Sequence, residues 1–150
     1  MTEKPLKIFV VEDSEWYNKI LVYTLSLNPD YEVKSFMNGS DFLRSLHESP
    51  DIVTLDYRLP DISGLEILKR IKRENNDIHV ILISEQGDID TVVNLLKLGA
   101  YDYITKTDDI KDRLLNTINN IQKGIGLKKE ITALRSEVQK KYSYHNTILG

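Results

Sequence analysis

The sequence predicts an α/β fold in which a doubly wound, five-stranded parallel sheet is followed by a C-terminal helical extension. Short apolar runs bounded by turn residues alternate with stretches of helical spacing over residues 6–123. Most of the runs are too continuously apolar for a sheet with one solvated face, so helices are expected on both faces. The strands are predicted at residues 6–11, 31–36, 51–55, 78–84 and 101–105.

Five helices are predicted to follow these strands in order. The first begins near Ser14, stops before the pair Asn28-Pro29 and carries an apolar series at three- or four-residue spacing: Trp16, Ile20, Tyr23 and Leu27. The second covers residues 40–47. The third follows the turn at residues 60–64 and places an apolar series on one side: Leu65, Leu68 and Ile71. The fourth spans residues 89–98 before Gly99, and the fifth begins near Asp108-Asp109.

Composition excludes several classes of function. The chain has 150 residues, a net charge of -3 and no cysteine, so disulfides, thiolate metal sites and cysteine nucleophiles are excluded. The acidic balance disfavours direct nucleic-acid contact by charge. The apolar run at residues 8–11 is too short for a signal-peptide core or a membrane span. We therefore expect a cytoplasmic protein without a membrane partner.

Acidic residues stand where two of the predicted strands end. Glu12 and Asp13 follow the first strand, and Asp56 follows the third. Ligands of doubly wound sheets bind at the carboxyl ends of the strands, so these three carboxylates are expected to converge. Their mutual repulsion is relieved by a hard divalent cation, and Mg²⁺ accepts carboxylate and phosphate oxygens together.

The fourth and fifth strands end in groups that suit a phosphoryl ligand. Ser84 offers a hydroxyl donor and Lys106 a compact positive charge. Each of these residues alone is more simply explained as a solvated residue at a strand end. Their joint occurrence, in order, at four strand ends favours a phosphoryl-transfer site.

Three segments identify a family resemblance: residues 10–14 (VVEDS), 55–65 (LDYRLPDISGL) and 98–106 (LGAYDYITK) resemble response-regulator receivers. The resemblance covers residues 6–123 and implies a flavodoxin-like strand order of 2-1-3-4-5. It implies the following site: Asp56 as phosphoacceptor; Glu12, Asp13, Asp56 and the backbone carbonyl of Arg58 as Mg²⁺ ligands; Ser84, Lys106 and Tyr103 as phosphate-binding and switch residues. On the residues alone, Tyr103 is equally well explained as a half-buried strand aromatic.

By this resemblance the chain takes a phosphoryl group from a histidine kinase or phosphotransfer protein and relays the change to a partner surface. No turnover of a separate substrate is expected. Two departures bear on the details. Glu85 follows Ser84 where the family usually has Ala or Gly, and Thr107 stands where a proline usually follows the lysine through a cis bond.

Residues 124–150 are expected to form a helical linker that leads from the receiver domain, residues 1–123, to an output domain absent from this sequence. Gly124 and Gly126 predict a break or hinge in the fifth helix. A later apolar series has coiled-coil spacing and predicts a homodimer seam: Leu127, Ile131, Leu134 and Val138. A helix folded back on its own domain remains the alternative. The linker and residues 144–150 resemble sigma-54-dependent, nitrogen-regulation-type transcription activators.

Two other functions remain in competition with a phosphorylation switch. A pseudo-receiver that signals without phosphate is motivated by Glu85 and Thr107. A Mg²⁺-dependent phosphatase with Asp56 as nucleophile requires a carboxyl general acid two residues further on. Arg58 occupies that position and argues against the phosphatase.

Overall fold

The computed structural model describes residues 4–85 and 89–149, with side chains as far as residue 141. Its strands are β1 (Leu6–Val11), β2 (Tyr31–Phe36), β3 (Ile52–Asp56), β4 (His79–Ser84) and β5 (Asp102–Thr105). The helices are α1 (Glu15–Ser26), α2 (Gly39–Ser45), α3 (Gly64–Glu74), α4 (Ile89–Lys97) and α5 (Ile110–Leu149), and the short 3-10 helix η1 (Leu46–Glu48) follows α2. Every predicted strand is confirmed to within one residue at each end.

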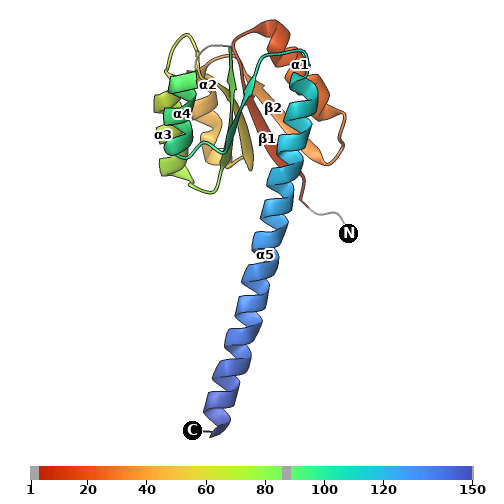
Figure 1. The fold of residues 1–150 in the computed structure, drawn as a ribbon, viewed down its shortest axis with the longest axis vertical. Helices are drawn as coiled ribbons and strands as arrows, with labels where there is room; N and C mark the ends of the chain where they lie inside the picture. Colours follow the sequence, from red (N-terminus) through yellow and green to blue (C-terminus); the bar gives the residue numbers. More distant parts are fainter. Residues whose placement is uncertain (1–3, 86–88, 150) are drawn as a thin grey trace. The chain divides into compact units, whose positions relative to one another are not determined.

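The five strands form one parallel sheet in the order β2-β1-β3-β4-β5, as expected. Figure 1 shows α2, α3 and α4 on one face of this sheet and α1 on the other, so the sheet is doubly wound. The register places Val11 opposite Leu55, and Ser84 opposite Thr105. The carboxyl ends of β1, β3, β4 and β5 therefore lie at one edge of the sheet.

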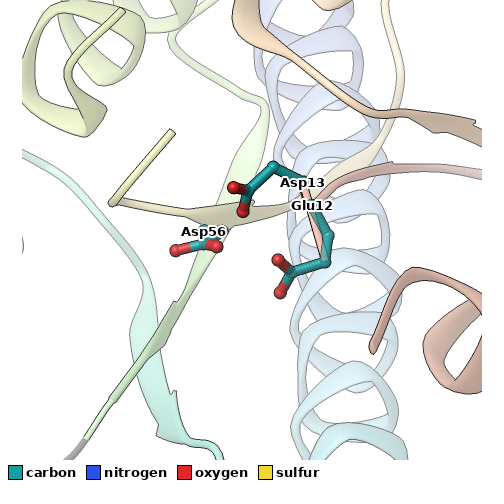
Figure 2. Close-up of side chains that lie close together, drawn as sticks. All are labelled: Glu12, Asp13 and Asp56. Carbon is teal, nitrogen blue, oxygen red and sulfur yellow. The ribbon is translucent and has the colours of Figure 1, made fainter. Parts of the chain in front are cut away.

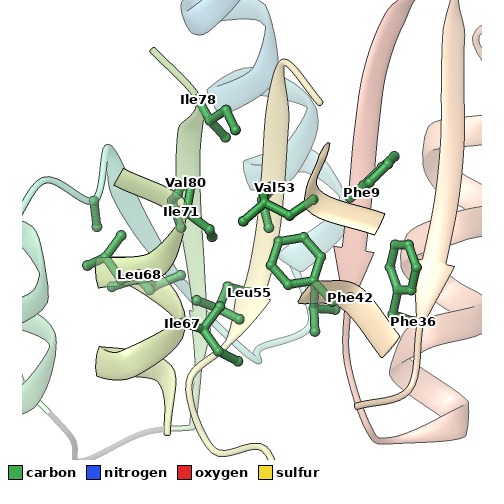
Figure 3. Packing of buried hydrophobic residues seen from close by; sticks show 14 of the residues in the cluster. Phe9, Phe36, Phe42, Val53, Leu55, Ile67, Leu68, Ile71, Ile78 and Val80 are labelled. Carbon is green, nitrogen blue, oxygen red and sulfur yellow. The ribbon is translucent and has the colours of Figure 1, made fainter. Parts of the chain in front are cut away.

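The core on the α2–α4 face of the sheet is built from alternate strand residues and from apolar helix residues. Figure 3 shows this cluster, whose strand members include Phe9, Val11, Val53, Leu55, Val80 and Leu82 and whose helix members include Phe42, Ile67, Leu68 and Ile71. The Phe9 and Phe36 ring centroids lie 5.2 Å apart, and the Phe42 ring meets Phe36 edge-on. Such packing fixes the strands relative to one another and so fixes their ends.

Ser14 caps the N-terminus of helix α1, because its hydroxyl accepts a hydrogen bond from the Tyr17 amide at 3.4 Å. Its buried residues are Asn18, Leu21, Thr24 and Leu25. The apolar series expected from the sequence lies largely on the opposite face: Trp16, Tyr23 and Leu27 are 71%, 66% and 66% exposed. Helical spacing alone does not distinguish the two apolar faces. In α3, likewise, Ile67 is buried and Leu65 is exposed.

The expected break at Gly124 and Gly126 is wrong, because α5 runs through both glycines without interruption. A glycine costs about 1 kcal/mol relative to alanine inside a helix, and no proline or buried polar contact adds to that cost here. The side chains of residues 144–149, and Gly150, lie outside the described part, so the resemblance at residues 144–150 is not tested. Among the described helices, none is both long and apolar enough to cross a membrane.

Candidate phosphoryl-transfer site

Three carboxylates converge at the carboxyl edge of the sheet. Glu12 and Asp13 directly follow β1, and Asp56 is the last residue of β3. One oxygen of each lies within 4.8 Å of the others, and Figure 2 shows their side chains gathered in one small space. Glu12 and Asp56 are buried, whereas Asp13 is exposed and opens the cluster to solvent. The convergence expected from the strand-end rule is therefore observed.

Lys106 brings a buried positive charge to this cluster. Its Nζ lies 2.9 Å from Glu12 Oε1 and 3.4 Å from Asp56 Oδ2, and the side chain is only 5% exposed. The ammonium also stands over the Tyr17 ring, 4.5 Å from its centroid. The Lys106 amide donates to the Ser84 carbonyl at 2.8 Å, which joins the ends of β4 and β5.

Thr107 does not turn Lys106 away from the site. No cis peptide bond occurs within residues 4–85 and 89–149, so the Lys106–Thr107 bond is trans. The Thr107 amide donates to the Thr105 carbonyl at 2.8 Å, and its hydroxyl donates to the Asp109 carboxylate. The turn is thus held by Thr107 itself, and the lysine still reaches Asp56.

Backbone and amide groups orient the carboxylates. The side-chain Nδ2 of Asn18, buried on α1, donates to the backbone carbonyls of Glu12 at 3.0 Å and of Phe36 at 3.3 Å and so fixes the backbone beneath the Glu12 carboxylate. The Ser14 amide donates to Glu12 Oε2 at 3.1 Å, and the Arg58 amide donates to Asp56 Oδ1 at 3.0 Å. Asn18 was not predicted from the sequence. The available signal was a polar residue four positions after a helix N-cap, on the face that meets the sheet.

Asp61 holds the loop between β3 and α3 against the start of α2. Its carboxylate accepts hydrogen bonds from the Gly39 amide at 2.9 Å and from the Ser40 amide and hydroxyl, both at 2.8 Å. These bonds, led by that from the Gly39 amide, lower the pKa of Asp61 to about 2. Gly64 completes the loop, because a Cβ there would lie 2.6 Å from Tyr57 Cα.

The two buried carboxyls differ in how readily they ionise. Burial, reinforced by the hydrogen bond and the charge of Asp56, raises the pKa of Glu12 to about 8. Burial also acts to raise the pKa of Asp56, but the hydrogen bonds from Glu12 and Arg58 and the charge of Lys106 outweigh it and lower that pKa. Of these two carboxyls, Glu12 therefore holds a proton more readily and Asp56 ionises more readily.

The donor set fits a hard divalent cation. Three carboxylate oxygens lie within 4.8 Å of one another, and their mutual repulsion favours a cation among them. Glu12 Oε1 has the Lys106 ion pair but, within the described part of the chain, no hydrogen bond. Glu12, Asp13 and Asp56 are therefore the residues that would hold such a cation.

The remaining predicted residues lie around this cluster at different depths. Ser84 is buried at the end of β4, beside Thr105 of β5. Tyr103 lies on β5 opposite Leu82 and is partly exposed to solvent. Glu85, which follows Ser84, places Oε1 3.8 Å from Lys106 Nζ.

Comparison with known proteins agrees with this geometry. Residues 8–119 match the response regulator receiver domain. The chain belongs to this family. Both the family resemblance and the fold class predicted from the sequence are thereby confirmed. The match takes in both acidic strand ends, Ser84 and Lys106.

Among characterised relatives, the receiver resembles regulatory proteins several times its length. It is 39% identical over 94 residues to the luminescence regulatory protein LuxO of Vibrio campbellii, covering 61% of this chain and 20% of LuxO. It is 38% identical over 82 residues to the DNA-binding transcriptional regulator NtrC of Proteus hauseri, covering 54% of this chain and 17% of NtrC. The chain thus spans about a fifth of the length of these relatives.

Solved structures share the receiver fold. NtrX of Brucella abortus superposes with a TM-score of 0.78 at 28% identity, covering 87% of this chain and 30% of NtrX. The beryllofluoride-activated receiver domain of DrrB superposes with a TM-score of 0.73 at 34% identity, covering 79% of this chain and 98% of that one. The family and the similar proteins therefore place this receiver in two-component signalling.

Proposed function

We propose that this receiver accepts a phosphoryl group on Asp56 in a Mg²⁺-dependent reaction and uses it to switch an output. The observation that carries the proposal is Lys106 Nζ, 3.4 Å from the Asp56 carboxylate inside a cluster of three carboxylates. The pKa of Asp56 is lowered and that of Glu12 is raised, so Asp56 is the more readily ionised of the two. A nucleophile, a cation site and a fixed positive charge are the parts that phosphoryl transfer needs.

The chemistry assigns separate roles to these residues. Glu12, Asp13, Asp56 and the carbonyl of Arg58 hold Mg²⁺, which when bound neutralises charge on the transferring group. An Asp56 oxygen attacks the phosphorus of a phosphohistidine on a histidine kinase or phosphotransfer protein. The new O–P bond forms as the P–N bond breaks, and the bonding electrons return to the imidazole. Lys106 stabilises the equatorial oxygens as a point charge.

The switch follows from the same charges. Once Asp56 carries a phosphoryl group, the Ser84 hydroxyl donates to its oxygens and leaves the space behind β4. Tyr103, partly exposed on the neighbouring strand, moves into that space. A local electrostatic change then selects between two arrangements of the α4–β5 surface.

Intact-mass analysis tests the acceptor directly. Incubation with acetyl phosphate or phosphoramidate and Mg²⁺ should add one phosphoryl group, absent from Asp56→Asn and reduced in Asp13→Asn. Modification that survives in Asp56→Asn contradicts the assignment. A wild-type protein that takes up no phosphoryl group, yet folds, supports the pseudo-receiver instead.

A second experiment separates acceptance from switching. Lys106→Ala should accept phosphate more slowly and lose the spectroscopic change at Tyr103, because the charge that joins the site to β5 is gone. Circular dichroism provides the control for an intact fold. An unaltered Tyr103 response in this variant contradicts the role given to Lys106.

The C-terminal helix suggests a homodimer. Its apolar series lies exposed along α5 and reads Leu127, Ile131, Leu134 and Val138. We accordingly assign residues 1–123 to the receiver and residues 124–150 to a dimerising linker. Because so short an apolar seam holds two helices together only weakly, the dimer also needs a second contact, made by the receiver.

The oligomeric state of seam variants tests the dimer. Leu134→Asp should shift the sedimentation of the whole chain from dimer to monomer. Ser136→Asp, with the same added charge off the seam, should not. A wild-type monomer, with or without beryllofluoride, contradicts the dimer.

The relatives suggest the output. LuxO is a luminescence regulatory protein and NtrC is a DNA-binding transcriptional regulator, and both are several times longer than this chain. We infer a cytoplasmic regulator in which this receiver controls a sigma-54-dependent transcription domain, without itself contacting nucleic acid or turning over a separate substrate. Reporter transcription with the full-length regulator, wild type against Asp56→Asn, tests this assignment.

A further inference from the structure

Glu85 stands at the solvent side of the buried charge cluster. It directly follows the last residue of β4, and its side chain is 58% exposed while that of its neighbour Lys106 is 5% exposed. Its Oε1 lies 3.8 Å from Lys106 Nζ. The ammonium thus faces three carboxylates, of which Glu85 alone reaches solvent freely.

The three ion pairs of Lys106 differ in how easily they break. Glu12 and Asp56 are held in place by hydrogen bonds from Ser14 and Arg58, and their burial makes loss of the ammonium costly. Glu85 is exposed, and its longer contact costs little to lose because water solvates the freed carboxylate. Any group that arrives at Lys106 from solvent therefore displaces Glu85 first.

A phosphoryl group on Asp56 is such a group. Its oxygens need the Lys106 charge, and they bring negative charge towards a carboxylate that already occupies the outer side of that ammonium. Glu85 therefore opposes the approach of a donor in proportion to the donor's own negative charge. The opposition weakens in salt because Glu85 is exposed.

We propose that Glu85 is a positioning residue that pairs with Lys106 in the unphosphorylated receiver and selects against phosphodonors of high negative charge. This inference rests on the proposed function of Asp56. An approaching phosphoryl group replaces Glu85 at Lys106, and the freed carboxylate turns to solvent. Transfer from a donor with a compensating positive charge is impeded least.

Two small donors and a matched control test the selection. Acetyl phosphate is a dianion near neutral pH, whereas phosphoramidate carries a protonated nitrogen and one less negative charge. At low salt, Glu85→Gln should raise the initial rate of Asp56 phosphorylation about fivefold with acetyl phosphate and about twofold with phosphoramidate. The difference should vanish near 1 M salt. Glu15→Gln makes the same change in net charge on a carboxylate paired with Lys19 at 3.0 Å, and it should leave both rates unchanged.

The ion pair itself has an independent readout. An alkaline titration followed through the Lys106 side-chain carbon resonances should have its midpoint lowered by about half a pH unit in Glu85→Gln. Glu15→Gln should not move it. This measurement needs no phosphoryl transfer, so it judges the pair even if the proposed function fails.

The outcomes are distinct. Equal acceleration with both donors, or the same acceleration in Glu15→Gln, overturns donor selection. An unmoved Lys106 midpoint in Glu85→Gln overturns the pairing. A wild-type receiver that takes a phosphoryl group from neither donor contradicts the function of Asp56, and donor selection falls with it. A donor-dependent acceleration together with a lowered midpoint supports the whole proposal.

Discussion

The unit that ends at Leu115 and the stretch of α5 from Leu127 to Val138 differ in which side chains they bury. In the first, most apolar residues are buried, and so are the side chains of Glu12, Asp56 and Lys106. In the second, leucine, isoleucine and valine are exposed along the helix. Buried charge survives only where partners are fixed around it, and exposed hydrocarbon in a regular series indicates a partner outside the chain. The first region buries its apolar and charged groups against one another, whereas the second leaves an apolar series in solvent.

The largest expected contrast is between two apolar truncations. Phe42→Ala removes a fully buried ring from the aromatic cluster and should lower the free energy of unfolding by about 3–5 kcal/mol. Leu134→Ala removes an exposed side chain and, at a concentration where the chain is monomeric, should change this free energy by less than about 0.5 kcal/mol. Urea denaturation followed by Trp16 fluorescence measures both. Similar losses in the two variants would remove the distinction between the regions.

Glycine substitutions sharpen the contrast, because the two regions should respond with opposite signs. Gly64→Ala places a Cβ 2.6 Å from Tyr57 Cα and should destabilise the receiver by about 1–3 kcal/mol. Gly126→Ala meets no atom within 4 Å and should stabilise the helix by about 1 kcal/mol. Thermal melts by circular dichroism report both changes. A stabilising Gly64→Ala would show that the β3–α3 loop yields.

The site should bind Mg²⁺ in a pH-dependent way. The pKa of Glu12 in the folded protein, about 8, lies above its ordinary 4.5, so the folded state holds the extra proton between these values. Without metal, stability should fall as the pH rises from about 4.5 to about 8. Mg²⁺ displaces that proton, so its affinity should rise by up to about tenfold per pH unit below 8 and then level off.

Calorimetry in buffers of different ionisation enthalpy measures the proton released with Mg²⁺ binding. Glu12→Gln should bind Mg²⁺ more weakly and without this proton release. If the Mg²⁺ affinity of the wild type changes by less than about twofold between pH 6 and pH 8, Glu12 is not the group that releases a proton on binding.

The smallest expected effect concerns Asp61. Its folded pKa of about 2 lies below the ordinary 3.8, so its carboxylate stabilises the fold above that range and loses the contribution as the pH falls from about 4 to about 2. Asp61→Asn should therefore narrow the difference in melting temperature between pH 2 and pH 4. Asp41→Asn, next to the same loop, controls for charge. An Asp61→Asn profile that parallels the wild type contradicts the contribution of these hydrogen bonds.

Much of the receiver was predictable from local pattern. Apolar runs of strand length alternating with helical spacing predict the five strands, and the rule for strand ends then brings Glu12, Asp13, Asp56 and Lys106 to one edge. Each step uses neighbours in sequence or a topology common to all doubly wound sheets. The continuity of α5 was mispredicted, because helix propensity is a weak preference and two glycines do not outweigh a long run of helix-forming neighbours.

Only the tertiary structure decided the rest. The sequence offers α1 two apolar faces, and the sheet selects the one with Leu21 and Leu25, leaving Trp16 and Tyr23 in solvent. The Asn18 side chain donates to the backbone carbonyls of Glu12 and Phe36, six and eighteen positions away, and so joins the ends of β1 and β2. Lys106 reaches Asp56 across fifty positions with a trans bond before Thr107, and it meets Glu85 there. Such contacts depend on distances through space between strands, and no pattern along the chain encodes those distances.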